Sequence, residues 1–184
     1  ATREKNLEAF RNFIPSIYDK FSKYKPQRYL LGVDESGVSL VDVQNKIHAY
    51  NGRPVDVAAI QAANFLAKPR LSVANFFSEE PHDDPRYFHS NLVNSIISST
   101  KDEMSFDVCL EKKISSMIFS GCGLGLQIER LNKTLDITHL IIYEPEEDIF
   151  YASLSTIDWS AILPRFSQGD RRLDLLIGLS PENA

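Results

Sequence analysis

The stretch "MIFSGCGLGLQIERL", residues 117–131, joins a short apolar run to an amphipathic run through three glycines at alternate positions. Gly121, Gly123 and Gly125 suit the sharp turn from a strand into a helix, because glycine adopts positive φ at little steric cost. The apolar residues around and after the glycines recur at three- or four-residue steps, which is typical of one helix face: Leu124, Ile128, Leu131 and Leu135. This stretch predicts a strand, a glycine turn and a helix in succession.

The same alternation continues to the end of the chain. "THLIIYEP", residues 138–145, is an unbroken apolar strand suited to the middle of a parallel sheet. We expect a second helix over roughly residues 146–163 and a third strand in "RLDLLIGL", residues 172–179. Residues 111–184 are therefore predicted to form a Rossmann-like βαβαβ unit, in which the glycine turn lies at the carboxyl edge of the sheet.

Residues 1–110 have a different organisation. An apolar stripe near the start predicts a helix that Pro15 kinks or splits near Phe13. Residues 28–50 have β-branched runs separated by turn residues, which predicts a small antiparallel meander. Two more helices are expected, between Pro54 and Pro69 and over 84–99. The fold class is mixed α/β, with N-terminal helices and a meander before the βαβαβ unit, as two segments or one compact domain.

Composition excludes several classes of partner. The net charge of −5 and the isoelectric point near 5.4 disfavour nucleic acid, because nucleic-acid binders concentrate Lys and Arg. No apolar stretch approaches the roughly 20 residues of a bilayer-spanning helix, so no membrane partner is expected. Two cysteines, Cys109 and Cys122, give no disulfide framework and favour a cytoplasmic location. We interpret Cys122 as a small buried residue rather than a reactive thiol.

The glycine turn has two interpretations. Bare amides of Gly121, Gly123 and Gly125 at a helix N-terminus could face a ribose or an anion. The dinucleotide fingerprint needs glycine where this chain has Leu126, whereas G-x-G-x-G resembles the first motif of methyltransferases that use S-adenosylmethionine. In those enzymes an acidic residue ends the second strand, where Glu144 stands. Alternatively the glycines only make a tight turn, and Glu144 begins the next helix.

Other polar clusters carry weaker hypotheses. "SEEPHDDPRYFH", residues 78–89, contains residue types that bind metals, but without a recognised ligand spacing, and we interpret it as a solvated loop with a helix cap. His139 lies within a strand-like run, where a hydrogen-bonded structural histidine is the ordinary interpretation. No Ser-His-Asp arrangement or nucleophile elbow marks a catalytic centre.

"MIFSGCGLGLQIERL" followed by "ITHLIIYEPEEDIFYASLSTIDW", residues 137–159, resembles the N-terminal domain of the bacterial motility accessory factor (Maf) family, which comprises flagellin glycosyltransferases. The N-terminal helix "NLEAFRNFIPSIYDKF", residues 6–21, and the meander are similar to that family in order and character. The resemblance implies a domain before the catalytic domain of a protein that transfers nonulosonic sugars to Ser or Thr of flagellin. It implies no catalytic residue in this chain and no cofactor of its own.

Two functions follow from these interpretations. In the first, this bacterial chain is a non-catalytic accessory domain whose partners are the catalytic domain of the same parent chain and flagellin. In the second, it is a module that binds a nucleoside or S-adenosylmethionine at Gly121, Gly123, Gly125 and Glu144. The second predicts an open crevice above the glycine turn, whereas the first predicts a crevice filled by side chains such as Leu124. A helix start at Pro181 also predicts that the chain is part of a longer protein.

Overall fold

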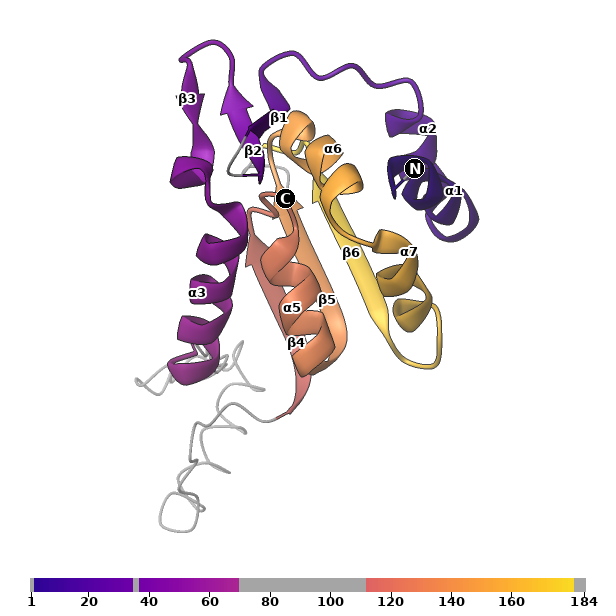
Figure 1. The fold of residues 1–184 in the computed structure, drawn as a ribbon. Helices are drawn as coiled ribbons and strands as arrows, with labels where there is room; N and C mark the ends of the chain where they lie inside the picture. The colour runs from indigo at the N-terminus through magenta and orange to yellow at the C-terminus, as the bar shows by residue number, and fades with distance from the viewer. Residues whose placement is uncertain (1, 35–36, 70–111, 181–184) are drawn as a thin grey trace, which may run out of the picture. The chain divides into compact units, whose positions relative to one another are not determined.

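A computed structural model describes residues 2–34, 37–69 and 112–180, and their elements are traced in Figure 1. The C-terminal half forms a parallel sheet of β4 (Lys113–Ser120), β5 (Asp136–Glu144) and β6 (Arg172–Ile177) in the order β4-β5-β6. The apolar run of β5 takes the central position, as expected for a strand buried between two neighbours. The predicted βαβαβ order is therefore confirmed, and with it the mixed α/β fold class.

The helices between these strands depart from prediction in one respect. α5 (Leu126–Thr134) follows the glycine turn as expected, but the predicted helix over 146–163 is wrong as a single element. It divides into α6 (Glu147–Thr156), α7 (Trp159–Ile162) and a short 3-10 helix, η3 (Leu163–Phe166). Ile157 is extended, and the carboxylate of Asp158 accepts a hydrogen bond from the Ala161 N–H, which starts a new helix.

The two faces of the parallel sheet differ in burial. Met117 of β4 pairs with Leu140 of β5, and both side chains are buried on the face that α5 and α6 cover (Figure 1). Successive side chains of a strand alternate between faces. Ile118 therefore points to the opposite face, where 67% of it is exposed. Its neighbour in register, Ile141, is half-buried.

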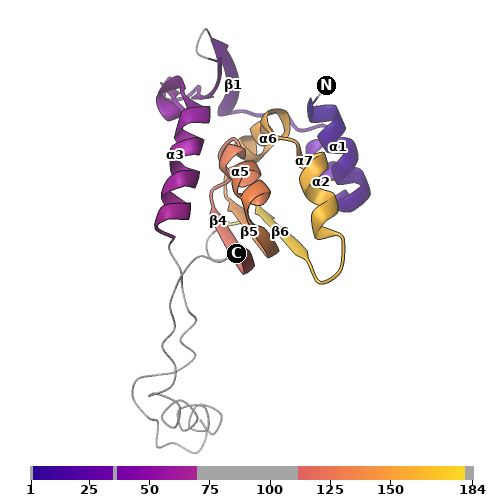
Figure 2. The same cartoon turned by 60° about the horizontal axis from the view of Figure 1, so that its bottom comes forward.

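The N-terminal segment forms two helices, α1 (Thr2–Phe13) and α2 (Pro15–Phe21), which confirms the predicted break at Pro15. α1 packs against α6 and α7, and Figure 2 shows the same arrangement from a second direction. The core of this contact is a cluster of aromatic rings with centroids 5.0 to 6.0 Å apart: Phe10, Phe21, Phe150 and Trp159. The described parts of 1–68 and 111–184 thus form one compact unit.

The predicted meander is also confirmed. β1 (Tyr29–Asp34), β2 (Gly37–Asp42) and β3 (Ile47–His48) form an antiparallel sheet in that order. A 3-10 helix, η1 (Ala49–Gly52), leads into α3 (Pro54–Ala67). α3 lies beside α5 in both Figure 1 and Figure 2, so the meander brings η1 close to the glycine turn.

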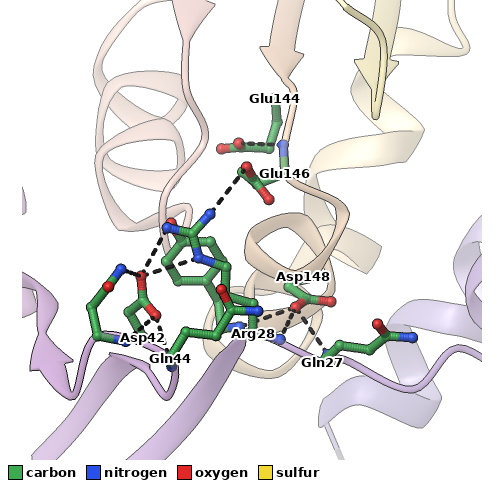
Figure 3. A network of polar contacts seen from close by, with 9 residues as sticks. Gln27, Arg28, Asp42, Gln44, Glu144, Glu146 and Asp148 are labelled. Carbon is green, nitrogen blue, oxygen red and sulfur yellow. Dashed lines mark hydrogen bonds and ion pairs between the residues drawn. The ribbon is translucent and has the colours of Figure 1, made fainter.

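A single carboxylate fastens the meander to the βαβαβ unit. Asp148 lies in the first turn of α6 and is only 6% exposed. Its Oδ2 accepts hydrogen bonds from three successive backbone N–H groups, those of Gln27, Arg28 and Tyr29, at 2.6 to 3.0 Å (Figure 3). Its Oδ1 accepts one more hydrogen bond, from the Tyr24 hydroxyl. Burial alone would raise the pKa of Asp148, but these hydrogen bonds outweigh it and lower the pKa.

An ion-pair network extends this attachment. The Arg28 guanidinium donates two hydrogen bonds to Asp42 Oδ2, at 3.0 and 3.1 Å, and lies 3.9 Å from Glu146 Oε1 (Figure 3). Burial acts to raise the pKa of Asp42, yet hydrogen bonds from Asn45 and Arg28 lower it to about 2. The meander is therefore held on the βαβαβ unit by buried and half-buried charges as well as by apolar contact.

Several expectations lie outside the described residues: the helix over 84–99, the polar cluster at 78–89, Cys109 and a helix start at Pro181. The division of the chain at 110 stays a prediction for the same reason. Within the described ranges, no helix is both long enough and apolar enough to cross a membrane.

We predict that Asp148→Asn lowers the free energy of unfolding by roughly 2–3 kcal/mol at neutral pH, because an amide offers the three backbone donors a weaker acceptor and adds N–H donors of its own. The folded-state pKa of Asp148 is lowered, so this stability is fully present above the unfolded-state pKa of about 4. It is lost as the pH falls through the folded-state pKa. Urea denaturation of both proteins at several pH values measures the difference.

Glu147→Gln on the same helix is the control, because the Lys20–Glu147 ion pair is about one-third exposed and is expected to contribute less than about 1 kcal/mol. Equal losses from the two substitutions, or a loss for Asp148→Asn that grows as the pH falls, would contradict this role for Asp148.

Candidate functional site

The glycine turn continues the ladder of the parallel sheet and then bends sharply. The Gly121 N–H donates to the Tyr143 carbonyl at 2.7 Å, and the Gly125 N–H donates back to the Cys122 carbonyl at 2.9 Å. Gly125 precedes the first residue of α5 with φ of +79°, in the left-handed region that favours glycine. The turn thus needs glycine for its backbone, whether or not a ligand binds there.

Two of the glycines are also required by close packing. A Cβ atom at Gly125 would lie 2.6 Å from Ile157 Cδ1, and one at Gly123 would collide with the hydroxyl of Tyr50. A Cβ at Gly121 would meet no atom within 4 Å, although φ is also positive there. Gly123 and Gly125 therefore let neighbouring groups approach the turn, whereas Gly121 faces open space.

Glu144 ends β5 directly beside this turn. Glu144 is only 3% exposed as a residue, and its carboxylate accepts hydrogen bonds from two backbone N–H groups. Cys122 donates to Oε2 at 2.9 Å and Glu146 donates to Oε1 at 3.1 Å (Figure 3 shows the second). These bonds tie the turn after β4 to the turn after β5. Glu144 therefore has the structural role of a helix-entry acid, and it still lies where the nucleoside interpretation requires an acid.

Cys122 is fully buried in the turn. Burial, together with the negative charge of Glu144, raises the pKa of the Cys122 thiol well above its usual value. A buried thiol with a raised pKa is a poor nucleophile, since the thiolate is the reactive form. The interpretation of Cys122 as a buried structural residue fits this environment.

Tyr50 brings a phenol to the glycine turn from η1, which follows the antiparallel meander. It is one of two described residues other than glycine with positive φ, at +63°, which is a strained backbone for a bulky side chain. Its hydroxyl lies against the backbone of the turn, so close to Gly123 that no side chain would fit there. Burial raises the pKa of Tyr50, and the nearby Cys122 and Glu144 add to that rise.

A cavity of about 600 Å³ opens above the turn. Its polar wall includes Tyr50, Gln61, Gln127 and Glu144, and Gly121 and Gly123 form part of its floor. Gln127 is held in place, because its Nε2 donates to the Cys122 carbonyl at 2.9 Å. The cavity has the size of small-molecule sites in proteins.

The structure brings together three of the four residues that the nucleoside interpretation named. Gly121, Gly123 and Glu144 line one cavity, whereas Gly125 is turned toward Ile157 and does not. The expectation that Leu124 fills the crevice is wrong. Leu124 is 2% exposed and packs with Leu40 and Ala152 instead, because the meander supplies an apolar surface on that side of the turn.

Comparison with known proteins identifies the family. The model of the glycosyltransferase Maf N-terminal domain matches residues 3–184. This chain belongs to the Maf N-terminal domain family. A similar solved structure, that of the Maf glycosyltransferase from Magnetospirillum magneticum AMB-1, is 26% identical with a TM-score of 0.68. The match covers 98% of this chain and 28% of that one. A comparison with curated proteins gave no significant match.

In this Maf N-terminal domain, sequence reasoning missed Tyr50, Gln61 and Gln127 as cavity residues. The position of Tyr50 beside the predicted Asn51-Gly52 turn is the one sequence feature that could have drawn attention to it. Nothing in the sequence predicts that the meander folds back to the glycine turn. Gln61 and Gln127 are ordinary helix residues in the sequence. Among the described residues, no group of three or more His, Cys, Asp and Glu side chains is arranged to hold a metal ion.

We predict that Gly125→Ala destabilises the domain by several kcal/mol, because it adds the contact with Ile157 to the left-handed backbone strain of about 1–2 kcal/mol. Gly121→Ala is the matched control, because φ is positive there but the new Cβ has open space around it. It should be destabilised only by the backbone strain. The double variant Gly125→Ala/Ile157→Val removes the Cδ1 atom that the new Cβ would meet, so it should recover part of the lost stability. Denaturant midpoints measure all of these variants, and equal losses for Gly121→Ala and Gly125→Ala would show that the Ile157 contact has no effect.

Proposed function

We propose that this chain is the accessory N-terminal domain of a motility accessory factor-like flagellin glycosyltransferase, and that it does not transfer sugar on its own. It positions the catalytic domain of the same parent chain, or the flagellin acceptor, through its surface. The observation that carries this proposal is the likeness to a Maf glycosyltransferase over 98% of this chain but only 28% of the other chain. Because the matched domain makes up 28% of that glycosyltransferase, most of its length is left for a separate catalytic region.

One face of the parallel sheet carries an exposed apolar side chain, and this supports the proposal. Parallel sheets are usually covered on both faces, because both faces of their strands are largely apolar. Here Ile118 is 67% exposed on the face opposite α5, and two strands away Asp174 contacts His139 at 2.7 Å and forms an ion pair with Arg172 at 2.9 Å. An apolar strand residue left exposed beside these paired polar side chains leaves this face able to pack against another part of the protein. We propose that the rest of the parent chain covers this face.

The contact of His139 with Asp174 agrees with the interpretation of His139 as a structural histidine.

The strand order β4-β5-β6 supports a Rossmann-like description of the βαβαβ unit, as one half of a doubly wound sheet. A cytoplasmic location is part of the proposal, because a free Cys122 stays reduced there. The accessory role requires no cofactor.

We predict that Ile118→Glu in the full-length parent protein lowers flagellin glycosylation, because a carboxylate would be desolvated in the covered interface. We expect a loss of about tenfold or more in transfer rate, measured by intact mass spectrometry of flagellin with a cytidine-activated nonulosonic sugar. The 184-residue chain, assayed alone with the same sugar and flagellin, should show no transfer.

Val55→Glu on α3 is the matched control, because Val55 is comparably exposed, at 54%, on a different surface. Both variants of the isolated chain should keep the wild-type melting temperature. Sugar transfer by the isolated chain would disprove the non-catalytic role, and equal effects of the two substitutions would disprove the interface.

A further inference from the structure

We propose that the cavity above the glycine turn binds a nucleoside-type ligand that carries vicinal hydroxyls and no phosphate. This inference goes beyond the accessory role, because a domain can position a neighbour without binding any small molecule. It depends on the geometry of the cavity and on the chemistry of its walls.

The charge of the walls determines the ligand class. Glu144 contributes a carboxylate, and none of the described residues that line the cavity is Lys or Arg. A ligand with a phosphate would bring like charge to Glu144 without a cation to offset it. Dinucleotide sites accept phosphate at a glycine turn through backbone amides. Here the Gly121 and Gly125 amides already donate to backbone carbonyls, and the Cys122 amide donates to Glu144. The turn therefore lacks several of the donors that a phosphate would use.

Glu144 is instead placed to accept hydroxyl groups. A carboxylate offers about four lone-pair sites, and the Cys122 and Glu146 amides take one on each oxygen. These two bonds fix the carboxylate in one orientation with acceptor capacity left over. Two adjacent hydroxyls, as on a ribose, match a fixed carboxylate because both can donate to it. The neighbouring Tyr50 O–H supplies a donor for an acceptor atom of the same ligand.

The remaining walls suit a flat ring. Phe119, Tyr143 and Ile149 line the cavity together with the ring of Tyr50. Aromatic and branched apolar side chains stack on planar heterocycles and bury them from water. The Gln127 and Gln61 carboxamides can donate to and accept from the edge of such a ring. A base that packs against the apolar side chains, with its ribose at Glu144, uses both kinds of wall.

The test compares ligands that differ in one group. The four common ribonucleosides, their 2′,3′-dideoxy counterparts and their 5′-monophosphates are titrated into the 184-residue chain by calorimetry, with S-adenosylmethionine as a cationic nucleoside. We expect at least one ribonucleoside or S-adenosylmethionine to bind saturably. The dideoxy form of the ribonucleoside that binds should be about tenfold weaker or worse, because it leaves the charged acceptor unpaired. The monophosphate should be about fivefold weaker or worse, owing to repulsion.

A charge substitution separates binding from folding, because Glu144 also holds the turn and its loss would alter both. Gln61→Lys adds a cation to the wall of the cavity, and Ala63→Lys adds one to the same helix outside it. Gln61→Lys should raise monophosphate affinity relative to the ribonucleoside by about fivefold or more, and Ala63→Lys should leave the ratio unchanged. The proposal is overturned if no nucleoside binds at millimolar concentration, if the dideoxy forms bind equally well, or if wild type prefers the monophosphates.

Discussion

The buried carboxylate of Glu144 is the constraint on which the rest of this domain depends. It accepts one backbone N–H from the turn after β4 and one from the turn after β5, so the carboxyl edge of the sheet is fixed at two adjacent strands. A buried charge is tolerated only when hydrogen bonds replace its hydration. Because backbone groups provide them here, the position of the turns follows from the position of β5.

The second carboxylate, Asp148, transmits this order to the N-terminal half of the chain. It lies four residues after Glu144, in the first turn of α6, and fixes the segment that leads into β1 through three backbone hydrogen bonds. The meander then places Tyr50 against Gly123, and Leu124 turns into the core between β2 and α6. The cavity stays open because the apolar side chain of the turn is buried elsewhere.

The sequence was sufficient for the elements whose cause is local. Pro15 breaks the first helix, alternation and turn residues define the meander, and the glycines with the apolar run of β5 define the βαβαβ order. The sequence was not sufficient where a contact between distant residues determines the structure. The helix expected over 146–163 breaks at Ile157, whose side chain fills the space beside Gly125. The cavity residues Tyr50 and Gln61 come from the other half of the chain, and no periodicity encodes that approach.

Amide hydrogen exchange at Cys122 and Glu146 tests the role of Glu144 most directly, because those two N–H groups donate to its carboxylate. A buried hydrogen bond that organises the fold opens only when the fold does. Both amides should therefore exchange as slowly as those of the central strand β5. Exchange at the rate of exposed loop amides, while β5 remains protected, would mean that the turns are held by something other than Glu144.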